Sequence, residues 1–215
     1  MIVNQIFASI NGEVSNAHQG SLCTFIRLAG CNLKCLYCDT SYARSAKDGK
    51  EMDIDSIIDK VRELGNRNIT ITGGEPMLQA EEMIFLALCL WLSGWEVSVE
   101  TNGTFMMEPI RSINWVADWK GPSSGMRDSM NIANYQSLRP ADIVKFVIED
   151  YPDFIDAVLT VQNLPLCKIA FSPSYGKMDP VQLTEWMKKE PMLRDRGAIF
   201  SWQIHKLLDL KERDV

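Results

Sequence analysis

Residues 22–40 read LCTFIRLAGCNLKCLYCDT, an apolar run with β-branched residues followed at once by three closely spaced cysteines. The run has the composition of a buried strand, and the cysteines follow its carboxyl end. Cys31, Cys35 and Cys38 leave three and two residues between them. That spacing lets one loop wrap three thiolates around a metal centre.

Strand-like and helix-like segments alternate along the rest of the chain. Strands are predicted at 2–7, 22–28, 69–72, 95–99, 115–118, 143–148 and 168–171. Helices are predicted at 54–64, 80–92 and 154–161, and two more follow the core at 181–189 and 201–208. This alternation favours parallel strands joined by right-handed crossovers, so we expect an α/β fold with a parallel sheet or a partial barrel.

Four polar motifs each come directly after a predicted strand. They are GCNLKCLYCDT at 30–40, TGGEP at 72–76, ETNG at 100–103 and DWKGPSSG at 118–125. Ligands bind at the carboxyl edge of parallel sheets and barrels, so we expect the four loops to converge on one site.

The composition is that of an ordinary globular protein, and we expect a single domain over residues 1–215. The chain is 46% hydrophobic and its net charge is −6, which gives little reason to expect nucleic-acid binding. The longest apolar stretch, 83–92, has about ten residues where a membrane span needs roughly twenty. The first residues lack a basic region followed by a long apolar run, so a cytoplasmic protein without a membrane partner is expected.

The spacing of the three clustered cysteines favours an iron–sulfur cluster over zinc. A structural zinc site usually closes with four ligands in pairs, and neither His18 nor His205 has paired spacing. A zinc site completed by a distant cysteine or by His18 stays an alternative. An iron–sulfur cubane can leave one iron without a protein thiolate, open to a reactant. The remaining cysteines lie apart in apolar surroundings and are expected to be packing residues: Cys23, Cys89 and Cys167.

The segment CNLKCLYC at 31–38 resembles the Cys-x3-Cys-x2-Cys signature of the radical S-adenosylmethionine (SAM) superfamily. In that superfamily the cysteines hold a [4Fe-4S] cluster whose open iron chelates SAM, and reductive cleavage of SAM yields a 5′-deoxyadenosyl radical. The resemblance implies a partial, modified (βα)6-type barrel with short C-terminal helical additions. It also implies these SAM-binding residues: Tyr37, Cys38, Asp39, Gly73, Gly74, Glu75, Glu100, Asn102, Asp118, Trp119, Lys120, Ser172, Pro173, Ser174 and Tyr175.

The flanking residues FASINGE at 7–13, FIRLAGCNL at 25–33, CDT at 38–40 and QIHK at 203–206 are similar to the 7-carboxy-7-deazaguanine synthase family. The resemblance implies radical ring contraction of 6-carboxy-5,6,7,8-tetrahydropterin to 7-carboxy-7-deazaguanine with loss of ammonia, on the route to queuosine-type nucleosides. It implies that Thr40 binds Mg²⁺. The implied substrate-binding residues are Ile10, Asn11, Gly12, Glu13, Arg27, Thr72, His205 and Val215.

One departure from this family lies at residues 11–14. Asn11 stands where the family usually has glutamine, and Val14 follows where a second glycine is common. Asparagine keeps the amide group but has a shorter reach, which puts its side-chain contact with substrate in doubt.

The resemblance further implies an external one-electron reductant such as a flavodoxin, a homodimer, and no nucleic-acid partner. No residue is expected to act as a conventional acid–base catalyst, because the radical forms at cluster-bound SAM. Two rival hypotheses stay open. One is an activase that makes a glycyl radical on a partner protein, and the other is a non-enzymatic regulator that carries a metal cluster.

Overall fold

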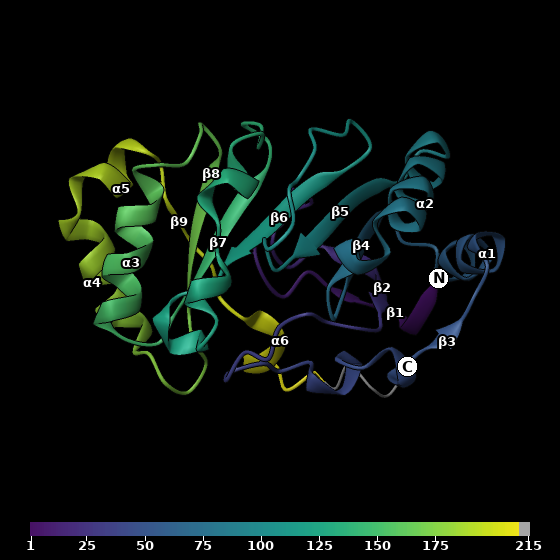
Figure 1. Ribbon diagram of the computed structural model, residues 1–215, viewed down its shortest axis with the longest axis horizontal. Coiled ribbons are helices and arrows are strands. Elements are labelled where there is room, and N and C mark those ends of the chain that lie inside the picture. The colour runs from purple at the N-terminus through teal and green to yellow at the C-terminus, as the bar shows by residue number, and fades with distance from the viewer. Residues whose placement is uncertain (211–215) are drawn as a thin grey trace.

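A computed structural model describes residues 1–210 and shows one nine-stranded sheet with helices packed against it (Figure 1). The strands are β1 (Ile2–Ile10), β2 (Leu22–Leu28), β3 (Lys50–Glu51), β4 (Asn68–Gly73), β5 (Glu96–Thr101), β6 (Asn114–Trp119), β7 (Ile143–Ile148), β8 (Lys168–Pro173) and β9 (Ile199–Phe200). The α-helices are α1 (Ile54–Leu64), α2 (Ala80–Leu92), α3 (Tyr151–Val161), α4 (Pro180–Lys189), α5 (Pro191–Asp195) and α6 (Ile204–Leu207). Short 3-10 helices are η1 (Ser41–Ala43), η2 (Ala46–Asp48), η3 (Pro76–Gln79), η4 (Pro122–Ser124), η5 (Arg127–Ser129) and η6 (Ile132–Tyr135).

The strand order is β3-β1-β2-β4-β5-β6-β7-β8-β9. β1 pairs antiparallel with β2 and β3, whereas each neighbouring pair from β2 to β9 is parallel. The order begins at β3 and ends at β9, so the sheet forms an open, partial barrel. In Figure 1, α1 and α2 flank the half that contains β1 to β5, and α3, α4 and α5 flank the half that contains β7 to β9.

The α/β architecture is the one predicted, and each predicted strand and helix has a counterpart. The connections make it a modified barrel, because the described segments 102–113 and 120–142, which join β5 to β6 and β6 to β7, carry no α-helix. The two-residue strands β3 and β9 were not predicted, since a segment that short shows no periodicity. The short helix α5 was also not predicted.

The helix predicted at 201–208 is too long, because only Ile204–Leu207 is helical. Ser201 is instead held extended beside β8: its backbone N–H donates to Phe171 O at 2.8 Å. Its hydroxyl also accepts from the backbone N–H of Val14 at 3.0 Å. These tertiary contacts outweigh the local helical preference of the segment.

The main hydrophobic core lies between the helices and one face of the sheet. Strand residues such as Ile71, Val99 and Trp115 pack there with helix residues such as Leu86 and Phe154. Successive side chains of a strand point to opposite faces. The alternate positions of the same strands are therefore free to line a site on the other face.

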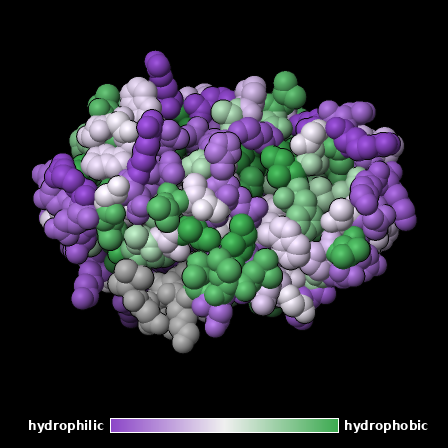
Figure 2. All heavy atoms as spheres, turned by 180° about the vertical axis from the view of Figure 1, so that it is seen from behind, coloured by the Kyte–Doolittle hydropathy of each residue, from purple (hydrophilic) through white to green (hydrophobic). Residues whose placement is uncertain are grey.

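No helix within residues 1–210 is long and apolar enough to cross a membrane. The outer surface is mixed, and Figure 2 shows hydrophobic side chains gathered in a patch at the lower centre of the back face. On α2, Phe85 and Leu92 are exposed although the helix packs on the sheet with its other face. Contiguous exposed apolar patches are typical of interaction surfaces.

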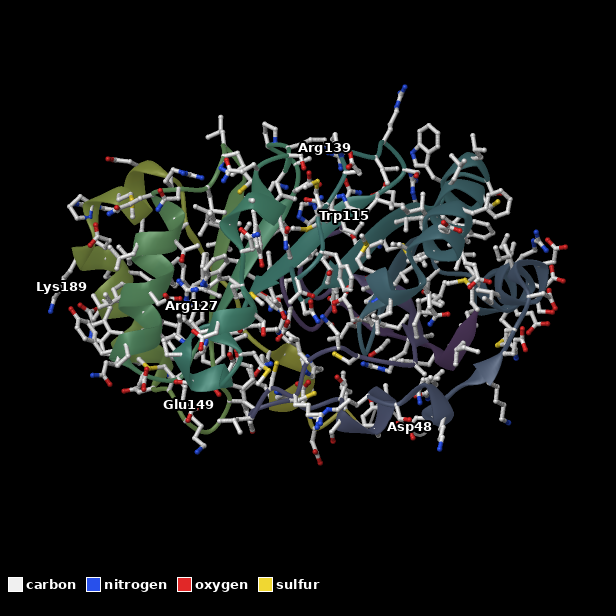
Figure 3. All side chains as sticks on the ribbon, in the orientation of Figure 1. Asp48, Trp115, Arg127, Arg139, Glu149 and Lys189 are labelled. Atoms are coloured by element: carbon white, nitrogen blue, oxygen red, sulfur yellow. The ribbon has the colours of Figure 1, made fainter. Side chains whose placement is uncertain are left out.

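The amino ends of β6 and β7 are joined by a buried carboxylate. Asp142 Oδ1 accepts from the backbone N–H of Trp115 at 3.0 Å, and Arg139 Nε donates to Asp142 Oδ2 at 3.0 Å. Figure 3 shows Arg139 at the upper edge of the molecule and Trp115 below it, further inside. Asp142 therefore fixes this edge, on the side of the sheet away from the polar motifs.

Asp142→Asn is expected to lower the free energy of unfolding by about 2 kcal/mol, because a buried ion pair loses one charge and Arg139 is partly solvated. The thermal midpoint should then fall by roughly 4–8 °C in a calorimetric scan. Asp59→Asn is the matched control. Asp59 pairs with Arg62 on the surface, where the two side chains are 67% and 64% exposed, so its midpoint should hardly move. Equal shifts in both variants would contradict this role of Asp142.

Candidate active site

A cavity of about 750 Å³ lies at the carboxyl ends of the parallel strands. Its wall combines strand ends with the cysteine loop, the loop after β1 and the segment around α6. In Figure 1 α6 lies in the lower half of the molecule, below the arrowheads of β5 and β6. All four polar motifs contribute to the lining, so the loops converge as the strand pattern predicted.

The three clustered cysteines all line this cavity. Backbone hydrogen bonds hold their loop: Cys31 N–H donates to Arg44 O at 2.8 Å, and Cys38 N–H donates to Cys35 O at 3.3 Å. The loop therefore presents its three thiols to one space from a fixed backbone.

The chemistry of the thiols fits an iron–sulfur cubane. Burial raises the pKa of Cys31 and of Cys35, so a bound metal is needed to stabilise their thiolates. Across residues 1–210, no group of three or more His, Cys, Asp or Glu side chains is close enough to hold one metal ion. A cubane does not require such closeness, because each thiolate binds a different iron. N–H donors also face the sulfur, with Leu33 N at 3.4 Å and Asn102 Nδ2 at 3.9 Å from Cys31 Sγ.

Two glycines bring the TGGEP loop against the end of β2. Gly74 N–H donates to Leu28 O at 3.0 Å, and Glu75 N–H donates to Gly30 O at 2.7 Å. A Cβ on Gly73, whose φ is +141°, would lie 2.1 Å from Leu28 O, and one on Gly74 would lie 2.0 Å from Gly30 O. Larger residues would push this loop away from the cysteine loop that begins at Gly30.

Gly74→Ala is expected to weaken SAM binding at least about tenfold and to lower cluster content, because the added methyl group collides with backbone on the cysteine loop. Equilibrium dialysis with labelled SAM and iron analysis would measure both. Gly94→Ala is the control: its φ is +95° and nothing lies within 4 Å of the added Cβ, so it carries backbone strain alone. If Gly74→Ala bound SAM as the wild type does, the loop contact would not matter for the site.

The Glu75 carboxylate joins the TGGEP loop to the ETNG loop and does not line the cavity. It accepts hydrogen bonds from Met77 N at 2.9 Å, Thr101 Oγ1 at 2.7 Å and Asn102 N at 2.6 Å. Burial raises the pKa of Glu75 despite these donors. Its side chain thus positions both loops and leaves only its backbone for a ligand.

A row of polar side chains crosses the inner face of the sheet from β2 to β7. The register pairs Arg27 with Thr72 and Asp118 with Lys145, and Glu100 stands between them on β5. Thr72 Oγ1 donates to Glu100 Oε2 at 2.9 Å. Burial raises the pKa of Glu100. All five line the cavity, as the two-residue period of adjacent strands requires.

The Arg27 guanidinium is buried between two aromatic rings. It lies 5.6 Å from the ring centroid of Phe7 and 5.6 Å from that of Tyr42. These cation–π contacts help to hold the guanidinium in place, and a planar fork held in this way suits bidentate binding of a carboxylate.

Two members of this row, Asp118 and Lys145, form a buried ionic group with Lys120. Lys120 Nζ donates to Asp118 Oδ2 at 2.6 Å, and Lys145 Nζ lies 3.1 Å from Asp118 Oδ1. Burial alone would raise the pKa of Asp118, but the two ammonium groups outweigh it and hold that pKa below its usual range. Lys145 Nζ also donates to Glu13 Oε2 in the loop after β1.

The segment QIHK packs over the loop after β1 and reaches the cysteine loop. Ile204 N–H donates to Gly12 O at 2.8 Å, and a Cβ on Gly12 would lie 2.1 Å from His205 Nδ1. Lys206 Nζ lies 2.7 Å from Asp39 Oδ2. The C-terminal segment therefore covers one side of the cavity.

Tyr37 carries an orphaned polar atom in this cavity. Its hydroxyl is buried and has no hydrogen-bond partner among residues 1–210, and burial raises its pKa to about 12. A neutral phenol facing a cavity in this way fits a ligand that supplies the missing partner.

Most of the predicted site residues lie on the cavity wall. Those predicted for SAM that do so are Tyr37, Cys38, Asp39, Gly73, Gly74, Glu100, Asn102, Asp118, Lys120, Ser174 and Tyr175. Those predicted for substrate or Mg²⁺ that do so are Ile10, Gly12, Glu13, Arg27, Thr40, Thr72 and His205. Val215 lies outside the described residues.

Some predicted residues point elsewhere. Trp119 alternates with Asp118, so its indole N–H donates to Asp156 Oδ2 at 2.8 Å on the helix side of the sheet. The Asn11 side chain accepts from Thr70 Oγ1 at 3.0 Å and donates to Ser21 Oγ at 3.0 Å, so it braces its own loop. Two more lie off the lining of the cavity, namely Ser172 and Pro173.

Several lining residues were not predicted from the sequence, among them Lys145, Gln203 and Lys206. The sequence did indicate a role for Lys145, because a lysine in the middle of the apolar strand IVKFVI must find partners when it is buried. Gln203 and Lys206 gave no such signal, since polar residues at the start of a short helix are ordinary.

Comparison with known proteins also indicates a radical SAM enzyme. Residues 25–118 match the family model of the radical SAM superfamily. The chain is 35% identical to 7-carboxy-7-deazaguanine synthase of Clostridium acetobutylicum, covering 94% of this chain and 93% of that protein. It is 34% identical to the protein of the same name from Leptospira interrogans, covering 99% and 97%. The crystal structure of QueE from Escherichia coli shares the fold, with a TM-score of 0.74 at 18% identity over 94% of this chain and 92% of that chain.

Proposed function

The chain belongs to the 7-carboxy-7-deazaguanine synthase family of radical SAM enzymes, and from this premise we propose that it converts 6-carboxy-5,6,7,8-tetrahydropterin to 7-carboxy-7-deazaguanine with release of ammonia. The observation that carries the proposal is the shared cavity. It brings the three cysteines together with the Arg27 fork and the Glu13 carboxylate. A pterin carboxylate and a pyrimidine edge need such partners.

The cysteine loop and the loops beside it would hold the cofactors. Cys31, Cys35 and Cys38 would hold the [4Fe-4S] cluster, and Tyr37 and Asn102, which line the same cavity, would contact SAM. When bound, the cluster and SAM would supply radical chemistry that takes hydrogen from C6 of the pterin. The protein itself orients and shields the reactants.

The inner face of the sheet and the loop after β1 would hold the pterin. Arg27 binds its carboxylate, and Glu13 accepts hydrogen bonds from the N–H and amino groups of the pyrimidine edge. Thr72 and His205 supply further polar contacts. The segment around α6 excludes water from one side, which protects a radical from side reactions.

We propose that Thr40 contributes its hydroxyl to Mg²⁺ beside the substrate carboxylate. Thr40 lines the cavity, and its Oγ1 lies 3.8 Å from Cys38 Sγ. One neutral oxygen is a poor magnesium site, so substrate oxygens and waters must complete the octahedron. Mg²⁺ should therefore bind together with the substrate.

The proposal also covers localisation, domain organisation and association. The enzyme is a cytoplasmic protein of one domain that forms a homodimer. An external one-electron reductant such as a flavodoxin would supply the electron. Leu36, between two cysteines, is 81% exposed, so the cysteine loop reaches the surface where such a protein could approach. The exposed apolar side chains of α2 are available for association.

Reductant-dependent cleavage of SAM separates this proposal from its rivals. With the pterin present, the enzyme should form deazaguanine while accumulating little 5′-deoxyadenosine, because the hydrogen returns to the product. An activase would consume SAM in proportion to radicals placed on a partner protein, and a regulator would cleave none. Stoichiometric SAM loss without deazaguanine would overturn the substrate assignment.

A further inference from the structure

Lys145 is a charged residue placed inside an apolar strand. Its neighbours Val144 and Phe146 are buried in the core on the other face of β7, and Lys145 itself is 6% exposed. A buried ammonium is costly unless it is paired. The strand register sets it directly beside Asp118 of β6.

The Lys145 ammonium joins two carboxylates that come from different parts of the site. Its Nζ lies 3.1 Å from Asp118 Oδ1 and also donates to Glu13 Oε2. The other oxygen of each carboxylate has its own donor: Gln203 Nε2 binds Glu13 Oε1 at 2.7 Å, and Lys120 Nζ binds Asp118 Oδ2 at 2.6 Å. Lys145 is thus shared by the two carboxylates, one predicted to face substrate and the other SAM.

We propose that Lys145 is a positioning residue that sets both pockets at once, by holding Glu13 toward the substrate and Asp118 toward SAM. This inference rests on the proposed function. A further carboxylate, Glu100, faces the same ammonium, and burial raises its pKa while Lys145 opposes the shift. Without the ammonium, neighbouring carboxylates repel one another or take up protons.

The two carboxylates differ in the hydrogen-bond donors that they keep when the Lys145 ammonium is removed. Asp118 keeps the ammonium of Lys120, whereas Glu13 keeps only the neutral amide of Gln203 among these contacts. Glu13 stands on a loop, and Asp118 stands on a strand. Loss of Lys145 should therefore weaken substrate binding more than SAM binding.

Lys145→Met tests this on protein with a reconstituted cluster, with pterin and SAM affinities measured separately by equilibrium dialysis. We expect iron content to be unchanged, pterin affinity to fall by about 30-fold and SAM affinity by about threefold to tenfold. Lys145→Arg should restore most of the pterin affinity, because it keeps the charge. Lys177→Met is the control, since Lys177 pairs with Glu149 on the surface at 3.7 Å, and it should change neither affinity.

A double-mutant cycle separates positioning from a general structural effect. If Lys145 acts through Glu13, adding Lys145→Met to Glu13→Gln should reduce pterin affinity by less than about threefold further. The inference would be overturned if the losses of pterin affinity in the two single variants multiplied fully in the double variant. It would also be overturned if the Lys145→Met protein bound pterin within about threefold of wild type. Should Lys145→Met fail to fold, Lys145→Gln carries the same comparisons. Failure of wild type to bind the pterin would refute the proposed function instead.

Discussion

Cys35→Ala is expected to leave the chain without an intact [4Fe-4S] cluster and without measurable product formation. Cys35 lies between the other two cysteines in the sequence and lines the same cavity wall. With two thiolates left, a second iron loses its protein ligand. Iron and sulfide analysis and the cluster absorbance would follow the loss, with activity measured on the same samples.

Cys89→Ala is the matched control for this experiment. Cys89 is a free, half-buried cysteine on α2 that does not line the cavity. Its replacement should keep the iron content and the activity. Retained turnover in Cys35→Ala, equal cluster loss in both variants, or zinc in place of iron would each contradict the ligand assignment.

Arg27→Met is expected to lower kcat/KM by about 10²–10³-fold, because the substrate carboxylate would be buried without its charged partner. Arg27→Lys should recover only part of this loss. Lysine keeps the charge but lacks the planar fork that the guanidinium presents beside Phe7 and Tyr42. Steady-state kinetics with 6-carboxytetrahydropterin would give both values.

The control for Arg27 is Arg62→Met on α1, where the Arg62 side chain is 64% exposed. This variant should retain the kinetics of the wild type. An Arg27→Met enzyme within about threefold of wild type would show that another group binds the carboxylate. A fully active Arg27→Lys enzyme would show that charge alone suffices.

Local patterns in the sequence predict the elements of the fold and the edge that carries the site. The run at 22–28 followed by the cysteines is enough to place those thiols at a strand's carboxyl end. The two-residue period of strands also explains why Asp118 lines the cavity while Trp119 does not. These features depend on neighbours in sequence, which a pattern can show.

The long-range contacts of the site could not be predicted in this way. Lys145 meets Glu13 across 132 positions of sequence, and Gln203 meets Glu13 across 190. Such pairs depend on the order of strands in the sheet and on the path of the loop after β1. Asn11 turns away from the cavity for the same reason, because its side chain binds Thr70 on β4, a strand that is separated from β1 by β2.

Radical chemistry in this cavity is expected to begin at C6 of the pterin. Protein with a reconstituted cluster should be incubated without oxygen, with reductant, SAM and 6-carboxytetrahydropterin that carries deuterium at C6. 7-Carboxy-7-deazaguanine is expected by mass, with deuterium appearing in the recovered SAM because SAM is regenerated. Cleavage of SAM without the deazaguanine, or deazaguanine formed with no deuterium in the SAM pool, would contradict this expectation.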